Sequence, residues 1–212
     1  MCNESIFKQI IEKFKLEPRI FYNEAQFQFD LAWAIKEKNE NFDIKLEPYN
    51  DKIGYTDIIV NDGNKKIAIE LKYKLADVET EYVINNCTIT LHKQGAVDEG
   101  CYDYCKDLQR IEELVNKNIV SEGYAIIIAN HPGYWGKSVN KKELKGETPW
   151  ESFRLNDQKE LNGELMWNGN ATSASRKENI VLSGSYKVKW DPYLEHDKYP
   201  FKYMIVQIPR KK

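Results

Sequence analysis

The chain has 212 residues, 42% hydrophobic and 30% charged, which excludes a disordered protein and allows a sizeable buried core. The formal net charge of −2 excludes a protein that coats nucleic acid by charge alone, but not an enzyme with one local basic groove. No apolar run approaches the length of a membrane span, and the first residues lack the apolar segment of a signal peptide, so we expect a cytoplasmic protein.

Two helices are predicted at the start of the chain. Residues 4–14 form a short leading helix, and residues 24–39 form a stronger one, with Asn23 as the N-cap and Gln26 three positions later, as in a capping box. Glu24 lies in the first turn of the second helix, where the helix dipole favours an acid, so a structural role and a functional role are equally open. Its buried stripe is Phe27, Leu31, Ala34 and Ile35.

Three strands follow. Residues 42–49 alternate apolar and polar side chains, which predicts a half-buried strand ending near Pro48. Residues 55–61 and 64–74 are two further strands, and Asp62-Gly63 between them predicts a two-residue hairpin turn. That turn pairs Asp57 with Ala68 and gives the hairpin one apolar face, formed by Ile58, Val60, Ile67, Ile69, Leu71 and Tyr73.

The opposite face of this hairpin carries Asp57, Glu70 and Lys72. In the predicted register Asp57 is diagonal to Glu70, with the Cβ atoms roughly 7–8 Å apart or less. Two carboxylates at that spacing can share a Mg²⁺ ion, and a nearby lysine can orient or deprotonate an attacking water. A solvent-facing charge pattern is the simpler explanation, because strand alternation often produces such pairs.

The next segments are a hairpin around Asn85-Asn86, a helix at 98–118 and a fully buried strand at 123–130. Asp103, Asp107 and Arg110 lie on a polar face of the helix, away from its apolar stripe. Past residue 131 we expect a turn, a lysine-containing loop at 136–147, and strands at 163–169, 184–193 and 201–208. The chain is thus one domain, with a core at 1–130 and a β-rich extension at 131–212 packed on it.

Four cysteines raise a separate question about zinc. Cys101 and Cys105 are four residues apart on one helix, and with Cys87 and His92 they make a conceivable ligand set. Their spacing matches no common zinc-finger pattern, so small, partly buried, reduced thiols are the competing interpretation.

The order helix, three strands, helix, strand, with "YTDIIV" and "IAIELKYK", resembles the PD-(D/E)xK nuclease superfamily, which has the restriction-endonuclease-like fold. The resemblance implies an α/β protein whose αβββαβ core holds a mixed sheet between helices. It matches the first acid to Asp57 and the (D/E)xK motif to Glu70-Leu71-Lys72, with Thr56 where many members have proline. The later segments are similar to uncharacterised bacterial members.

By this resemblance Asp57, Glu70 and the Leu71 carbonyl hold Mg²⁺, for which Mn²⁺ substitutes, and Lys72 and Glu24 complete the catalytic set. Gln94 and Arg110 are candidates for substrate binding, although pairing with Asp107 is the simpler role for Arg110. The expected activity is a metal-dependent endonuclease acting on DNA, in restriction or defence, with no membrane partner and with a homodimer as one option. The alternatives are an inactive binding module on the same fold, and an enzyme acting on RNA or a nucleotide.

Overall fold

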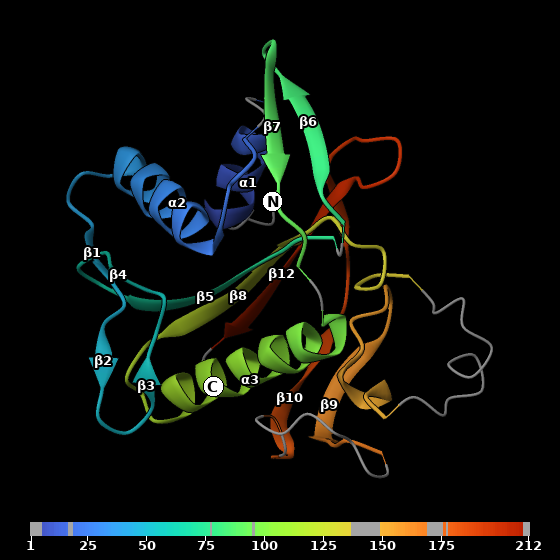
Figure 1. Ribbon diagram of the computed structural model, residues 1–212. Helices are drawn as coiled ribbons and strands as arrows, with labels where there is room; N and C mark the ends of the chain where they lie inside the picture. The colour runs from blue at the N-terminus through green and yellow to red at the C-terminus, as the bar shows by residue number, and fades with distance from the viewer. Residues whose placement is uncertain are drawn as a thin grey trace.

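Three helices pack on the two faces of a six-stranded mixed sheet (Figure 1). This computed structural model describes residues 6–16, 19–76, 78–94, 96–136, 149–168, 176 and 178–209. Figure 1 shows α1 and α2 on one face of the sheet and α3 on the other. The helices are α1 (Ile6–Leu16), α2 (Glu24–Lys38) and α3 (Val97–Asn116), with a 3-10 turn at Glu151–Phe153.

The central sheet has the strand order β1-β4-β5-β8-β12-β11. All neighbours are antiparallel except β5 and β8, which are parallel and are connected through α3. A parallel pair requires such a crossover, and a helix is its usual form. The strands are β1 (Asp43–Leu46), β4 (Ile58–Asn61), β5 (Lys66–Lys74), β8 (Glu122–Ala129), β11 (Asp191–Leu194) and β12 (Phe201–Pro209).

Three two-stranded antiparallel pairs surround this sheet. Figure 1 shows the β6–β7 hairpin projecting away from the sheet beside α1, and β2–β3 extending from β1 and β4. The third pair, β9–β10, packs against α3 through β10. The strands are β2 (Tyr49–Asn50), β3 (Gly54–Tyr55), β6 (Thr80–Ile84), β7 (Cys87–Leu91), β9 (Glu160–Leu165) and β10 (Ile180–Lys187).

Local sequence signals account for most of these elements. Asn23 caps α2 by accepting the Gln26 N–H at 2.8 Å, and the predicted apolar stripe of α2 is buried. Asn85 and Asn86 both have positive φ, as a two-residue hairpin turn requires, so the predicted hairpin is confirmed. Strand β8 is buried along nearly its whole length, as its continuous apolar sequence predicts.

Two hydrophobic cores lie on the two faces of the sheet. The first joins α1 and α2 to one face and contains Phe27, Tyr73 and Ile126. The second joins α3 and the β9–β10 pair to the other face and contains Leu108 and Ile127. Because successive side chains of a strand point to opposite faces, β5 and β8 contribute to both cores.

The turn between β4 and β5 is longer than predicted. Asn61 pairs with Lys66, so four residues separate the strands instead of two. The Asp62 carboxylate is the cause: its Oδ1 accepts the N–H groups of Asn64 at 2.8 Å and Lys65 at 2.6 Å, which builds a wider turn. The register shifts by two residues, so the paired side chains keep their predicted faces, and the ladder ends at Ile58 opposite Ile69, one residue short of Asp57 and Glu70.

Other strand predictions need smaller corrections. β1 is an exposed edge strand rather than half-buried, because β4 is its single neighbour among the described strands and Leu46 is 43% exposed. The strand predicted at 184–193 is two strands, β10 and β11, which belong to different sheets. The strand predicted at 163–169 begins earlier, at Glu160, and ends at Leu165.

Part of the β-rich extension belongs to the central sheet: β11 and β12 are its last two strands, whereas β9 and β10 form a separate pair. β12 pairs with β8 over eight residues, from Lys202 opposite Ala129 to Pro209 opposite Glu122. Apart from Gly136, the predicted lysine-containing loop lies outside the described residues. None of the helices in the described ranges combines the length and the hydropathy that a membrane span requires.

Candidate active site

One edge of β5 carries a row of backbone N–H groups that donate to side chains. The β4–β5 ladder ends where Ile58 pairs with Ile69, so the chain beyond that point has no β4 partner. A buried N–H without a partner is costly, and side-chain oxygens take the place of the missing strand. The three bonds run from Leu71 N to Asp57 Oδ2 (2.6 Å), from Tyr73 N to Glu24 Oε2 (2.9 Å) and from Leu75 N to Gln94 Oε1 (3.2 Å).

Glu70 lies beside this edge and is almost completely buried, with 1% exposure. Its Oε1 accepts a hydrogen bond from Arg110 Nη1 at 3.0 Å, whereas its buried Oε2 has no hydrogen-bond partner among the described residues. Burial, together with the nearby Asp107 and Asp57 carboxyl groups, raises the pKa of Glu70 to about 9. Burial also raises the pKa of Asp57.

Lys72 projects from the same face of β5 as Glu70 and reaches α3. Its Nζ lies 2.7 Å from Asp107 Oδ2 and 3.9 Å from Glu24 Oε1, and it donates to the Leu71 carbonyl at 3.0 Å. Burial lowers the pKa of Lys72, but the Asp107 and Glu24 carboxylates outweigh burial and hold the pKa above its ordinary value. Lys72 therefore remains a charged hydrogen-bond donor at neutral pH.

Asp107 and Arg110, one turn apart on α3, connect the helix to the two catalytic candidates of β5. Arg110 Nη2 lies 3.4 Å from Asp107 Oδ1, and its Nη1 also donates to the Tyr55 carbonyl at 3.2 Å. Asp107 is 3% exposed, and burial raises its pKa to about 6 despite the adjacent Lys72. The predicted Arg110–Asp107 pair is thus present, together with a contact to Glu70 that the helix spacing alone does not predict.

Gln28 of α2 supports the chain at Asp57 from the other side. Its Nε2 donates to the Asp57 carbonyl at 2.7 Å and to Glu47 Oε1 at 2.8 Å. Glu47 also donates its backbone N–H to the Asp57 carbonyl at 3.0 Å. The backbone at Asp57 is therefore fixed by both α2 and the end of β1.

Acidic groups predominate in this cluster. It contains four carboxyl groups, from Glu24, Asp57, Glu70 and Asp107, against the two cations Lys72 and Arg110. A site with surplus buried carboxyl groups is electrostatically suited to a divalent cation, whose binding would favour their ionised forms.

Most of the predicted site residues meet here. Asp57, Glu70, Lys72 and Glu24 lie around one stretch of β5, and Arg110 contacts Glu70. Gln94 has a different place: its side chain accepts the Leu75 N–H, and its backbone N–H donates to the Ala76 carbonyl. Both of these contacts serve the backbone beyond the end of β5.

Asp107 is the residue that sequence reasoning did not assign to the site. The available signal was its position three residues before Arg110 on the polar face of a helix whose other face is buried. Its burial and its contact with Lys72 depend on the crossover of α3 beneath β5, which local sequence does not specify.

The conceivable zinc set is not assembled. Cys87 is exposed on β7, and His92 is exposed after the end of that strand, whereas Cys101 and Cys105 are buried in the second core. No group of three or more histidine, cysteine, aspartate or glutamate side chains in the described ranges is arranged to hold a metal ion. The Mg²⁺ site expected from the sequence uses two carboxylate side chains and one backbone carbonyl, which is fewer than three such side chains.

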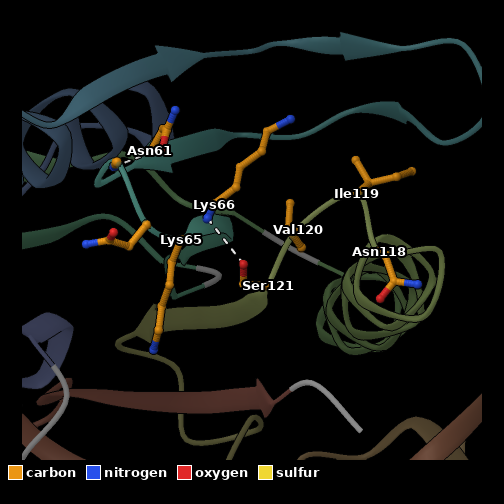
Figure 2. Close-up of a pocket in the computed structure, with 9 residues that line it drawn as sticks. Asn61, Lys65, Lys66, Asn118, Ile119, Val120 and Ser121 are labelled. Carbon is orange, nitrogen blue, oxygen red and sulfur yellow. Dashed lines mark hydrogen bonds between the residues drawn. The ribbon is translucent and has the colours of Figure 1, made fainter. Parts of the chain in front are cut away.

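A cavity of about 310 Å³ lies at the other end of β4 and β5 (Figure 2). Figure 2 shows the backbone N–H of Lys66 donating to the Ser121 hydroxyl (3.4 Å), while the Lys66 side chain points away from Ser121. From Lys66 to Glu70 the strand rises roughly 13 Å, so this cavity is separate from the carboxylate cluster. It is lined by Asn61, Gly63, Asn64, Lys65, Lys66, Asn118, Ile119, Val120 and Ser121.

Comparison of the chain with protein-family models, with curated proteins and with solved structures found no match.

Proposed function

We propose that this protein is a Mg²⁺-dependent endonuclease that hydrolyses phosphodiester bonds in DNA, in a restriction or defence context. The observation that carries the proposal is the convergence of Asp57, Glu70 and Lys72 at one edge of β5, where a buried Glu70 oxygen has no hydrogen-bond partner among the described residues. A carboxylate oxygen buried in this way is costly unless an ion or a water completes its coordination.

The arrangement of elements supports the proposal. With the β2–β3 and β6–β7 hairpins set aside as insertions, the order along the chain is α2, β1, β4, β5, α3 and β8, that is, helix, three antiparallel strands, helix and parallel strand. This is the αβββαβ order of the restriction-endonuclease-like fold. The sheet order β1-β4-β5-β8 places the E-x-K strand in the interior of the sheet, beside the crossover helix.

The donor set fits Mg²⁺. Asp57 and Glu70 provide carboxylate oxygens, and the Leu71 carbonyl keeps one lone pair after accepting from Lys72. These residues would hold the ion, and Mn²⁺ would accept the same oxygen ligands. When bound, Mg²⁺ supplies polarisation of a phosphodiester and a water of lowered pKa.

The protein's own groups have distinct tasks in this proposal. Lys72 is held in its charged form by Asp107, so it can donate a hydrogen bond to the attacking water or to the phosphate and stabilise negative charge there. Its role is therefore to orient the water or the phosphate, and not to abstract a proton. Glu24 fixes the backbone at Tyr73 and lies within 3.9 Å of Lys72, so it positions the lysine. Arg110 is a positioning residue for Glu70 and, with 30% of its side chain exposed, a candidate phosphate contact.

One observation favours the alternative, an inactive binding module on the same fold. Glu70 and Lys72 already have protein partners, Arg110 and Asp107, so the cluster is largely satisfied without a metal. A module of this kind would bind nucleic acid or a protein and would leave phosphodiesters intact.

Cleavage of a panel of DNA and RNA substrates with Mg²⁺ or Mn²⁺ separates the two functions. We expect wild-type protein to cut DNA, and Asp57→Asn, Glu70→Gln and Lys72→Met to lose at least about 100-fold in rate, as is usual when one electrostatic catalytic group is removed. The two amides are nearly isosteric with the acids that they replace, so the fold should be retained in both variants. Asp57→Asn and Glu70→Gln should also lose Mg²⁺ binding in calorimetry, whereas Lys72→Met should retain it.

The matched control is Gln207→Ala, which removes an exposed polar side chain of β12 that contacts Glu122 and none of the site residues. Its cleavage rate should stay close to that of the wild type. Unchanged cleavage in the Glu70→Gln protein would remove Glu70 from the mechanism, and folded wild-type protein that cuts nothing in the panel would favour the binding module.

A further inference from the structure

The β2–β3 hairpin begins where the β1–β4 ladder ends, next to Asp57. Two backbone bonds continue the ladder into it, from Glu47 N to the Asp57 carbonyl at 3.0 Å and from Thr56 N to the Pro48 carbonyl at 3.2 Å. Figure 1 shows β2 and β3 extending past β1 and β4 toward the carboxyl-terminal end of α3. The hairpin is therefore an outgrowth of the strands that carry the candidate active site.

Two tyrosines occupy this hairpin as a cross-strand pair. Tyr49 is opposite Tyr55, their ring centroids are 5.0 Å apart, and the side chains are 62% and 59% exposed. Within the described part of the chain neither hydroxyl has a hydrogen-bond partner. We call Tyr49 and Tyr55 the tyrosine pair.

Tyr55 of the tyrosine pair is close in sequence to Asp57. Thr56, between Tyr55 and Asp57, is buried, with 2% exposure, whereas Tyr55 is exposed. The exposed ring lies two residues from a proposed metal ligand.

Arg110 fixes the hairpin relative to the proposed site. Its Nη1 donates both to the Tyr55 carbonyl at 3.2 Å and to Glu70 Oε1 at 3.0 Å, so one guanidinium nitrogen connects the hairpin backbone to the Glu70 carboxyl group. Ile53, at the turn of the hairpin, packs against the second core. These contacts hold the tyrosine pair in a defined position beside the carboxylates.

We infer that the tyrosine pair stacks on an unpaired base of DNA, and that the substrate therefore contains a single-stranded segment at the scissile phosphate. The inference rests on the proposed nuclease function and narrows its substrate. Bases inside an uninterrupted duplex already stack on their neighbours, so an aromatic side chain gains most from a base that is free. Lys52, exposed between β2 and β3 and without an ion pair in the described ranges, supplies a cation for the adjacent phosphate.

Binding measured without divalent ions tests this inference independently of cleavage. Fluorescence anisotropy in EDTA compares a single-stranded DNA oligonucleotide with the matching duplex, for wild type, Tyr55→Val, Tyr55→Phe and Trp33→Ala. Valine keeps the β-propensity of the position but removes the ring, and phenylalanine keeps the ring. Trp33, 57% exposed and stacked on Phe29 along α2, controls for any exposed aromatic side chain.

We expect Tyr55→Val to weaken single-strand binding by about 5- to 150-fold, the range for loss of one stacked base. Tyr55→Phe and Trp33→Ala should stay within about twofold of wild type, which is less than the smallest change expected for loss of a stacked base. Lys52→Gln should lower the salt dependence of log K by about 0.7, as for one phosphate contact on a single strand. Equal affinity of wild type and Tyr55→Val would overturn the inference.

An oligonucleotide with abasic residues separates base stacking from damage to the hairpin. It retains the phosphates and removes the bases, so Tyr55→Val and wild type should bind it equally. If Tyr55→Val loses affinity equally for the normal and the abasic oligonucleotide, the tyrosine maintains the structure of the hairpin, and this result would overturn base stacking. Tyr49→Val provides the second variant if Tyr55→Val fails to fold. Tyrosine-dependent binding without cleavage would reject the nuclease and keep the stacking site.

Discussion

At the scale of single residues, each acid of the candidate site has a structural task as well as a chemical one. Asp57 and Glu24 accept N–H groups of β5 that lie beyond the reach of β4, and Asp107 holds Lys72. Alanine substitutions would remove both tasks at once. Amide substitutions at these positions keep a hydrogen-bond acceptor and are therefore the informative ones.

The Lys72–Asp107 pair gives a stability prediction. Lys72→Met leaves a buried carboxyl group without its nearest cation, and we expect the free energy of unfolding to fall by about 3 kcal/mol. Combining it with Asp107→Leu removes the unpaired carboxyl group and should restore most of that loss. Urea unfolding of the two single variants and the double variant measures the coupling.

Cleavage by the double variant then separates stability from catalysis. If Lys72 orients the water or the phosphate, the restored protein still cuts no DNA. Recovery of cleavage along with stability would leave Lys72 as a structural partner of Asp107 only. Lys106→Met, which breaks an exposed pair with Glu178, is the control and should cost about 1 kcal/mol or less.

At the scale of elements, periodicity and caps predict the helices and most strands, and turn chemistry decides their register. Asp62-Gly63 matches a two-residue turn, yet the Asp62 side chain binds two following N–H groups and widens the turn. The face of Asp57 is predicted correctly only because the shift is even. The partners of Glu70 and Lys72 on α3 are not predictable in this way, because they depend on where the crossover helix packs.

Glu112 of α3 provides an element-scale prediction about the attachment of β10. Its Oε1 accepts from Gly184 N and from the Tyr186 hydroxyl, both at 2.6 Å, and its Oε2 accepts from Ser183 N at 2.7 Å. Glu112→Ala removes all three bonds from a carboxylate that is 4% exposed, and we expect a loss of about 3 kcal/mol or more.

The neighbouring residue is a matched control for this change. Among the described residues Glu113 pairs only with Lys117, on the surface of the same helix, so Glu113→Ala should cost about 0.5 kcal/mol or less. Urea unfolding of both variants is the measurement. Equal stability of the two variants would mean that Glu112 does not fasten β10 to α3.

At the scale of the whole molecule, the sheet joins the two halves of the chain. β12 and β11 extend the sheet beyond β8, although the sequence predicts β strands there without indicating their partners. The reason is that β12, with its apolar positions on both faces, pairs with a strand more than seventy residues earlier. The local sequence pattern predicts that a segment is a strand. Which strand it pairs with, when the two are so far apart in the sequence, depends on the assembled core.

The buried carboxyl group of Glu70 predicts how global stability depends on pH without metal. Its pKa is raised from 4.5 to about 9, so across that interval the folded protein keeps a proton that the unfolded chain has lost. The free energy of unfolding should therefore fall as pH rises, by up to about 1.4 kcal/mol per unit for this group. Urea unfolding from pH 5 to pH 9 in EDTA measures the slope.

Glu70→Gln should flatten this dependence because glutamine has no proton to lose. Asp107, with a pKa raised to about 6, continues to contribute a slope of the same sign below neutral pH. A wild-type protein whose stability rises between pH 7 and pH 9 would contradict a raised pKa for the buried carboxyl group of Glu70.

The decisive measurement is cleavage of a circular plasmid carrying a single-stranded gap. Wild-type protein should linearise it in Mg²⁺ but not in EDTA, and identically purified Glu70→Gln protein should leave it circular in both. Cleavage that persists in the Glu70→Gln protein, or folded wild-type protein that leaves the plasmid circular in both Mg²⁺ and Mn²⁺, would contradict a nuclease centred on Asp57, Glu70 and Lys72.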